Sequence, residues 1–430
     1  MTVYLVSGFI FIATFAAILL GKVNRTIVAM AGAGVMVAVG IGMGFYSQEA
    51  ALASIDFNTL GLLLGMMILV SILALTGFFE YLAILTAKYS KGNPWVLFLL
   101  LGTITAVLSM FLDNVTTIVL IAPVTVLIAQ ILGISPVPLL IGEALLSDTG
   151  GVATLIGDPP NIMIGSAAGL SFIDFLVNLA PIVLVAWLVA LVVLRFLYRE
   201  YLSQTPGNVE ALMKLDERAA LHDRAALTRI LIVLGGTILL FFVHNLFHLQ
   251  PGFVALLGAA AALLWVQPAD VEEVLKHVEW PVLMFFAALF VTVGGIEASG
   301  LLNLLAEGVT ALATQDMLLT GVALIWCGAI LSAIMDNIPF TIVMIPVIQD
   351  LGLSTGLNIT PLWWALALGA GFGGNGTIIG STANVITVAI SEKTSTPITS
   401  KMWMKTGLPV MAATLLVATI LFVLRFDSLQ

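Results

Sequence analysis

The sequence contains few charged residues and only one cysteine. Lys, Arg, Asp and Glu make up 9% of its 430 residues, whereas 60% of the residues are hydrophobic. A soluble globular chain carries about 25% charged residues, so this composition excludes an ordinary water-soluble domain. Cys327 stands alone in an apolar run, which excludes a disulfide framework and a paired-cysteine metal motif.

Several other chemical signatures are missing. The four histidines are His222, His244, His248 and His277. They lack the spacing of metal ligands, so we predict neither a metal site nor a cofactor. The glycine run at 369–376 is not followed by Gly-Lys-Ser/Thr, which excludes a phosphate-binding loop. No repeated filter ring and no Gly-x-Gly-Asp motif appears, which disfavours a channel or an intramembrane enzyme.

Long apolar windows dominate the chain instead, and a helix needs about 20 residues to cross a bilayer. The windows lie at about 3–20, 26–45, 57–77, 95–133, 137–170, 174–197, 228–247, 252–266, 280–299, 317–352, 361–391 and 404–425. Two of them, 95–133 and 317–352, are too long for one span and predict re-entrant helical hairpins. The windows 137–170 and 361–391 carry Gly and Pro in their middles and predict broken helices. The predicted fold class is an all-α polytopic membrane protein.

The two halves of the chain repeat each other at an offset of 223 residues, the difference between 113 and 336. The matched positions are mostly polar residues, Gly or Pro, which chance does not favour in so apolar a chain. They include Asp113-Asn114 with Asp336-Asn337, Pro123 with Pro346, Gly150-Gly151 with Gly373-Gly374, Thr154 with Thr377, Gly157 with Gly380, and Asn161 with Asn384. We therefore predict a first repeat at 1–198, a linker at 199–227 and a second repeat at 228–430.

Each repeat is expected to cross the bilayer five times, and an odd number makes the second repeat inverted relative to the first. With the N-terminus outside, only Arg425 of the fifteen Lys and Arg residues falls on the outer side. No positive residue precedes Val3 to Leu20, so we expect a retained helix rather than a cleaved signal peptide. The predicted location is the plasma (inner) membrane, with both termini outside and the linker cytoplasmic.

The hairpins are expected to turn at their Asp-Asn pairs, because Asp and Asn are good N-caps. Each turn would then place a helix N-terminus, with its free N–H groups, at membrane depth. The broken helices add two more interruptions, and unwound backbone in a bilayer is tolerated only where protein buries it or it lines a cavity. Four interruptions related by the repeat therefore predict one central site.

The residues at these interruptions are the candidates for binding and coupling. For substrate binding they are Asp113, Asn114, Thr116, Thr154, Asn161, Asp336, Asn337, Thr341, Asn375, Thr377 and Asn384. For ion coupling they are Asp148, Glu143 and Asp158, none of which has an acidic counterpart in the second half. No Lys or Arg falls among the four interruptions, so we expect no fixed cation and a proton or sodium as coupling ion. A capping role alone is the alternative for Asp113, Asp336 and Asp158.

The motif pair LDNVTT…GGVATLIGDPPN and MDNIPFT…GGNGTIIGSTAN resembles the ion transporter superfamily. The similar branch contains arsenical pump membrane proteins and the melanosomal P-protein, and the likeness runs from about Asp56 to Ile390. It implies a scaffold at about 1–90 and 228–312 and a transport domain at about 95–197 and 317–425. It also implies elevator-type alternating access.

The leading functional hypothesis is proton-coupled efflux of arsenite or antimonite, or of a similar small neutral or anionic solute. Thiolate coordination would need more than Cys327, so arsenite would bind as uncharged As(OH)₃. A sodium/proton antiporter is the alternative. A sodium-coupled carboxylate transporter is more distant, because the dicarboxylate branch has Ser-Asn-Thr where this chain has Asp-Asn. The expected partners are the solute and the lipid bilayer, with no nucleic acid and a homodimer through the scaffold as the candidate assembly.

The topology gives a first prediction. In a Cys327→Ser background, a cysteine at position 2 should react with an impermeant thiol reagent in intact cells, and one at position 210 should not. The reason is the distribution of Lys and Arg, which places position 2 outside and position 210 in the cytoplasm. Labelling at 210 but not at 2 would overturn the topology and the inverted repeat.

Overall fold

The computed structural model describes residues 2–268 and 270–429, which form helices and connecting segments without a β-strand. The helices of the first repeat are α1 (Thr2–Leu20), α2 (Arg25–Met43), α3 (Gln48–Ala53), α4 (Phe57–Leu75), α5 (Phe78–Tyr89), α6 (Pro94–Phe111), α7 (Asn114–Leu132), α8 (Val137–Gly151), α9 (Pro159–Ala168), α10 (Phe172–Asn178) and α11 (Ala180–Leu197). The linker contains α12 (Arg199–Leu202), α13 (Val209–Met213) and η1 (Glu217–Ala220). The second repeat contains α14 (Arg224–Val243), η2 (His244–Phe247), α15 (Pro251–Val266), α16 (Val271–Lys276), α17 (Trp280–Ser299), α18 (Leu301–Ala313), α19 (Met317–Met335), α20 (Asn337–Thr355), α21 (Thr360–Gly374), η3 (Ile378–Gly380), α22 (Thr382–Ser391), α23 (Ser400–Leu424) and η4 (Phe426–Ser428).

The described helices make the chain an integral membrane protein. Eleven of them are long and apolar enough to cross a bilayer, or twelve if α9 and α10, bent by 114° at their junction, count as one span. The overlong windows resolve into helix pairs, α6 with α7 and α19 with α20, and we call these the first and second hairpins. The windows with central Gly and Pro resolve into α8 with α9 and α21 with α22, as predicted for broken helices.

Helix boundaries follow the offset of 223 residues closely. Helices α7, α8 and α9 correspond to α20, α21 and α22 without any shift at either end. The short helices α5 and α18 also correspond, although the apolar windows did not predict them. Each follows a glycine in the left-handed region, Gly77 with φ 79° and Gly300 with φ 81°, where a side chain would strain the backbone. The repeat is therefore structural as well as sequential.

Contacts between the halves are reciprocal. Helix α22 packs against α7 and α8, and α9 packs in the same way against α20 and α21. Helix α4 packs against α15 as α17 packs against α2, while α11 packs against α23. Contacts in which each element meets the counterpart of its partner are the mark of a two-fold relationship. The inversion of the repeats relative to the bilayer stays a prediction.

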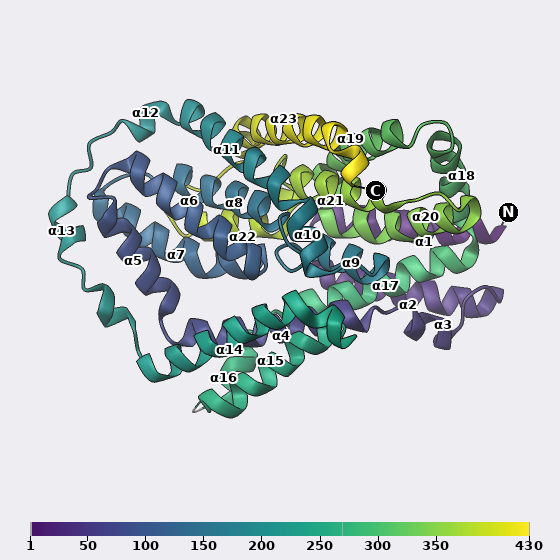
Figure 1. Cartoon of the computed structure of the whole chain (residues 1–430), viewed down its shortest axis with the longest axis horizontal. Helices are drawn as coiled ribbons and strands as arrows, with labels where there is room; N and C mark the ends of the chain where they lie inside the picture. The colour runs from purple at the N-terminus through teal and green to yellow at the C-terminus, as the bar shows by residue number, and fades with distance from the viewer. Residues whose placement is uncertain (1, 269, 430) are drawn as a thin grey trace.

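The linker runs around the outer end of α5, α6 and α7 before it reaches α14 (Figure 1). Its backbone is tied to both sides of this path, because Gly207 N donates to Leu132 O at 3.2 Å and His222 N donates to Thr76 O at 3.0 Å. The Nζ atom of Lys88 lies 2.6 Å from Glu217 Oε2, and this ammonium lowers the pKa of the Glu217 carboxyl. The linker thus packs along α5, α6 and α7.

Helix α4 approaches α15 closely at two glycines with the GxxxG spacing, Gly61 and Gly65. A Cβ atom at Gly65 would lie 2.4 Å from the carbonyl carbon of Ala255, and one at Gly61 would lie 3.2 Å from Leu256 Cδ1. Such spacing lets two helix backbones come together, and here it fixes the packing between one helix of each repeat.

Substituting Gly65→Val should lower the thermal unfolding midpoint of the purified protein. The two backbones must separate to admit the side chain, and overpacking of this kind costs about 1–3 kcal/mol. Gly235→Val in α14 is the matched control, because a Cβ atom there meets nothing within 4 Å. Equal midpoints for the two variants would contradict the close approach of α4 and α15.

Candidate functional site

Both hairpin tips present the N-terminus of a buried helix. In the first hairpin, Asp113 Oδ1 accepts from Thr116 N at 2.9 Å, and the Thr116 hydroxyl donates to the same carboxylate. In the second, Asp336 Oδ1 accepts from Ile338 N at 3.3 Å. Both aspartates are N-caps as predicted. The following residues, Asn114 and Asn337, open α7 and α20 and are buried.

The unwound segments of the broken helices are held by one asparagine each. Asn161 Nδ2 donates to Val152 O at 3.0 Å and to Thr154 O at 2.8 Å. Its repeat partner Asn384 Nδ2 donates to Gly374 O at 2.9 Å and to Thr377 O at 3.1 Å. These amides satisfy carbonyl groups that the broken helix leaves free, as burial in a membrane protein requires.

The unwound segments are also tied to the hairpins. Thr154 Oγ1 donates to Met110 O, and Thr377 Oγ1 donates to Ala333 O, the equivalent atom of the second hairpin. Both hydroxyl protons are therefore engaged in holding the loop beside the tip.

Two glycines close each loop on itself. A Cβ atom on Gly151 would lie 2.5 Å from Gly157 O, and one on Gly380 would lie 2.6 Å from Gly374 O. No larger residue fits at these crossings, which explains why the loops carry glycine at these positions.

Five side chains from all four interruptions meet between the hairpin tips, and we call them the central cluster: Asn114, Asn337, Asp148, Asp158 and Ser381. Asn114 Nδ2 donates to Asp148 Oδ1 at 2.9 Å and to Asp158 Oδ1 at 3.4 Å. Asn337 Nδ2 lies 3.2 Å from both carboxylate oxygens of Asp158, and Ser381 Oγ donates to Asp148 Oδ1 at 3.1 Å. Although Asp158 is the N-cap residue of α9, its side chain makes no capping hydrogen bond.

The central cluster has an excess of acceptors. Asp148 and Asp158 are each 1% exposed, and within residues 2–268 and 270–429 no Lys or Arg lies within 4.0 Å of either carboxylate. Buried oxygens without a hydrogen-bond partner also gather at the interruptions: Asn114 Oδ1, Asp148 Oδ2, Asn161 Oδ1, Asn375 Oδ1 and Asn384 Oδ1. Two buried carboxylates that share one amide require a proton or a metal cation, because uncompensated charge in an apolar interior is costly.

Besides the capping and loop residues described above, three more predicted residues lie outside this cluster. Thr341 Oγ1 donates to Asn337 O at 2.8 Å within its own helix. Asn375 Nδ2 donates to Thr149 Oγ1 at 3.1 Å and links the two broken helices. Glu143 is bonded to Thr125 Oγ1 at 2.6 Å, and its Oε2 atom has no partner. Glu143 therefore does not share hydrogen bonds with Asp148 and Asp158 in this conformation.

The expectation that no fixed cation touches the site is wrong. The Nη1 atom of Arg25, at the start of α2, lies 3.2 Å from Asp336 Oδ2 and donates to Thr382 Oγ1 at 2.8 Å. The guanidinium also lies over the ring of Phe285, 5.1 Å from its centroid. No sequence pattern indicated this contact, because 311 residues separate Arg25 from Asp336. Ser381, by contrast, was visible as the repeat partner of Asp158.

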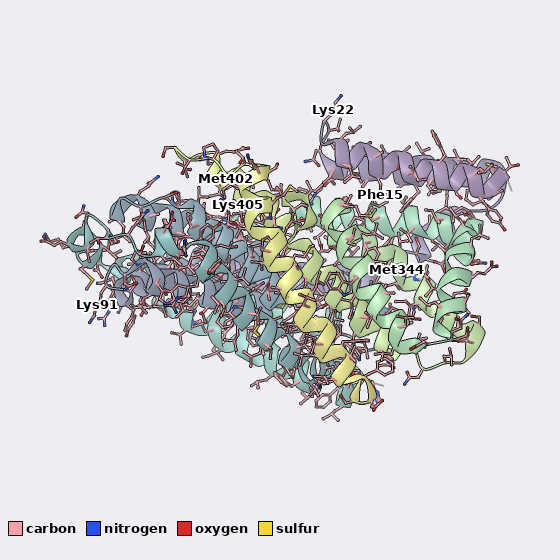
Figure 2. The ribbon with its side chains drawn as sticks, turned by 90° about the horizontal axis from the view of Figure 1, so that it is seen from above. Phe15, Lys22, Lys91, Met344, Met402 and Lys405 are labelled. Atoms are coloured by element: carbon pink, nitrogen blue, oxygen red, sulfur yellow. The ribbon has the colours of Figure 1, made fainter. Side chains whose placement is uncertain are left out.

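A cavity of about 500 Å³ opens beside these residues, and we call it the vestibule. Its lining includes Lys22, Arg25, Val115, Glu279, Met335, Asp336, Ile379 and Thr382. The lining thus joins the α1–α2 corner to both hairpin tips. Figure 2 shows Lys22 at the end of α1, with its side chain directed away from the ribbon.

Backbone geometry distinguishes the two tips. Asp336 has φ 77° and ψ 147°, whereas its repeat partner Asp113 has φ −62° and ψ 154°. A non-glycine residue near this region costs about 1–3 kcal/mol and persists only where the surroundings hold it. The strained tip is the one that binds Arg25.

The sequence is similar to a family of transporters and to several membrane proteins. A model of the family described as CitMHS, citrate transporter, matches residues 15–369. The 46 kDa membrane protein of Mycobacterium leprae is 40% identical to this chain over 97% of both. The human P protein is 33% identical, with 92% of this chain and 57% of the P protein covered.

A solved structure shares the fold. The YdaH transporter of Alcanivorax borkumensis matches with a TM-score of 0.59 at 16% identity, over 94% of this chain and 96% of that one. At this identity the likeness extends to the fold alone. The family model covers well over half of the sequence, and the P protein confirms the resemblance seen in the motifs. The chain is a membrane transporter and belongs to the CitMHS citrate transporter family.

Proposed function

We propose that the protein is a proton-coupled secondary active transporter of a small oxygen-rich solute. The observation that carries this proposal is the pair Asp148 and Asp158, buried without a basic partner and bridged by the tip amide Asn114. A proton on one of the two acids removes the electrostatic cost of their proximity. Its release would follow a change in access to the pair, and this couples proton movement to the motion of the tips.

Two solutes fit different parts of the site. Uncharged As(OH)₃ or its antimony equivalent suits the amides and hydroxyls of the central cluster, where no cation lies within 4.0 Å of the acids. A carboxylate such as citrate suits the vestibule, because Arg25 lies there and a guanidinium pairs well with carboxylates. The contact of Arg25 with a hairpin tip favours the carboxylate, and the family description points the same way.

Sodium/proton exchange is the second candidate, supported by the unpartnered oxygens. Amide and carboxylate oxygens are the ligands that hard cations take in proteins, and five such atoms lack a donor at the interruptions. A bound sodium ion would coordinate these oxygens and would also offset the negative charge of the two acids.

Proteoliposomes with a pH-sensitive dye inside would test these candidates together. Citrate, arsenite and sodium are added separately to vesicles of the wild-type protein under an imposed pH gradient. Proton flux that depends on citrate or arsenite supports the proposal and selects the solute. Dissipation of the gradient by sodium alone decides for sodium/proton exchange, and no response to any of the three rejects the proposal.

Asn114→Ala and Asn337→Ala should each reduce transport to below a tenth of the wild-type rate. Each change removes an amide that donates to Asp148 or Asp158, and a buried acceptor left unpaired costs about 1–3 kcal/mol. Asn208→Ala, at an exposed position in the linker, is the control. A wild-type rate in either tip variant would show that its tip does not line the site.

Asp148→Asn should abolish or uncouple proton-driven flux while the fold persists. The amide can still accept from Ser381 but cannot carry a proton between the two sides. The measurement is solute flux in proteoliposomes at a series of imposed pH gradients. If the pH dependence is unchanged, proton coupling lies with another acid, Asp113 or Asp336.

A further inference from the structure

The second hairpin tip contacts an arginine, Arg25, whereas the first hairpin tip has no arginine or lysine at the position that corresponds to Arg25 in the repeat. At the offset of 223 residues, Arg25 corresponds to His248 and Asp336 to Asp113. Asp113 is held by the cap of its own helix, with Thr116 bonded to both carboxylate oxygens. Asp336 instead accepts from Ile338 N, from Arg25 and, at 3.4 Å, from the Thr382 hydroxyl. The Arg25 contact is therefore an addition to the repeat rather than part of it.

The position of Arg25 allows it to meet a solute. Its side chain is 27% exposed and lines the vestibule, where the other charged lining residues are Lys22, Glu279 and Asp336. Phe285 holds the guanidinium by a cation–π contact, and this fixes its location without neutralising its charge. Asp336 is the carboxylate that neutralises it, so a solute carboxylate would compete with Asp336 for the same group.

The competition has a structural consequence at the tip. While Arg25 binds Asp336, that residue keeps a φ of 77°, which its repeat partner does not adopt. Strained backbone persists only where its surroundings hold it. If a solute takes the guanidinium, Asp336 loses its ion pair and is left with the contacts from Ile338 N and the Thr382 hydroxyl.

We propose that Arg25 is the residue that recognises an anionic, carboxylate-bearing solute in the vestibule, and that the solute replaces Asp336 on its guanidinium. The exchange removes the ion pair at the second hairpin tip at the moment of binding. This inference rests on the transport function proposed above, and it identifies the solute class as an anion rather than a neutral hydroxide.

Citrate protection of a vestibule cysteine tests the assignment without requiring transport. Val385 lines the vestibule and is 42% exposed, so Val385→Cys in a Cys327→Ser background provides a single reactive thiol. Neutral N-ethylmaleimide is used, because its access does not depend on the charge of Arg25. Citrate should slow the labelling, and the citrate concentration for half protection is the readout.

Two substitutions should move this concentration in opposite directions. Arg25→Gln should raise it at least tenfold, because a charge-assisted carboxylate contact is lost. Asp336→Asn should lower it severalfold, because the competitor for the guanidinium is gone while asparagine still caps α20. Arg199→Gln, an exposed linker arginine, should leave it unchanged.

A purely structural ion pair would give a different pattern, because both variants would break the same bridge. The proposal would be overturned if the citrate concentration for half protection rose in both variants. It would also be overturned if that concentration were unchanged in Arg25→Gln. Failure of citrate to protect the parent protein, with arsenite-driven proton flux intact, would reject Arg25 as an anion site and leave the transport function standing. Protection that follows the expected pattern without any solute-driven flux would support Arg25 and reject proton-coupled transport.

Discussion

Backbone that leaves helical geometry inside a bilayer must find its hydrogen-bond partners within the protein, and the centre of this molecule is organised by that requirement. Asn161 and Asn384 each satisfy two carbonyls of an unwound segment. Facing glycines then bring the two ends of each segment into backbone contact. Asp148, Asp158 and the tip amides do not hold the unwound backbone in this way and bond to one another instead.

The repeat supplies the frame of the site, and departures from the repeat supply its chemistry. Asn114 and Asn337 are equivalent and both donate to Asp158, so a single acid is shared by two symmetric tips. The counterpart of Asp158 is Ser381, which donates to Asp148 instead of adding a third negative charge. The two acids therefore lie on one broken helix, and the opposite half contributes donors. This division produces one acidic centre rather than two.

The sequence predicted the fold well because the constraints that fix it are local. Apolar length defines the spans, and Gly, Pro and the Asp-Asn pairs mark where helices stop and start, so α7, α8 and α9 and their counterparts were foreseen with short boundary errors. The helices α5 and α18, of 12 and 13 residues, were missed because they are too short to register as membrane-spanning windows. Arg25 was missed because its contact with Asp336 depends on how the α1–α2 corner packs against a hairpin far along the chain. Glu143 was placed with the coupling acids by its asymmetry alone, yet its hydrogen bond goes to Thr125.

The two aspartates that open the hairpins show how one motif can hold two conformations. Asp113 and Asp336 occupy equivalent positions and both cap a helix, but Thr116, which donates twice to Asp113, is replaced by Pro339 in the second hairpin. Proline has no N–H to donate, so this cap cannot form at Asp336, whose carboxylate is reached from outside the motif by the guanidinium of Arg25. A carboxylate paired with an arginine of another helix is open to competition from the adjacent cavity, whereas a carboxylate closed by its own cap is not. The two-fold arrangement therefore contains one tip that is closed locally and one whose ion pair lines the vestibule.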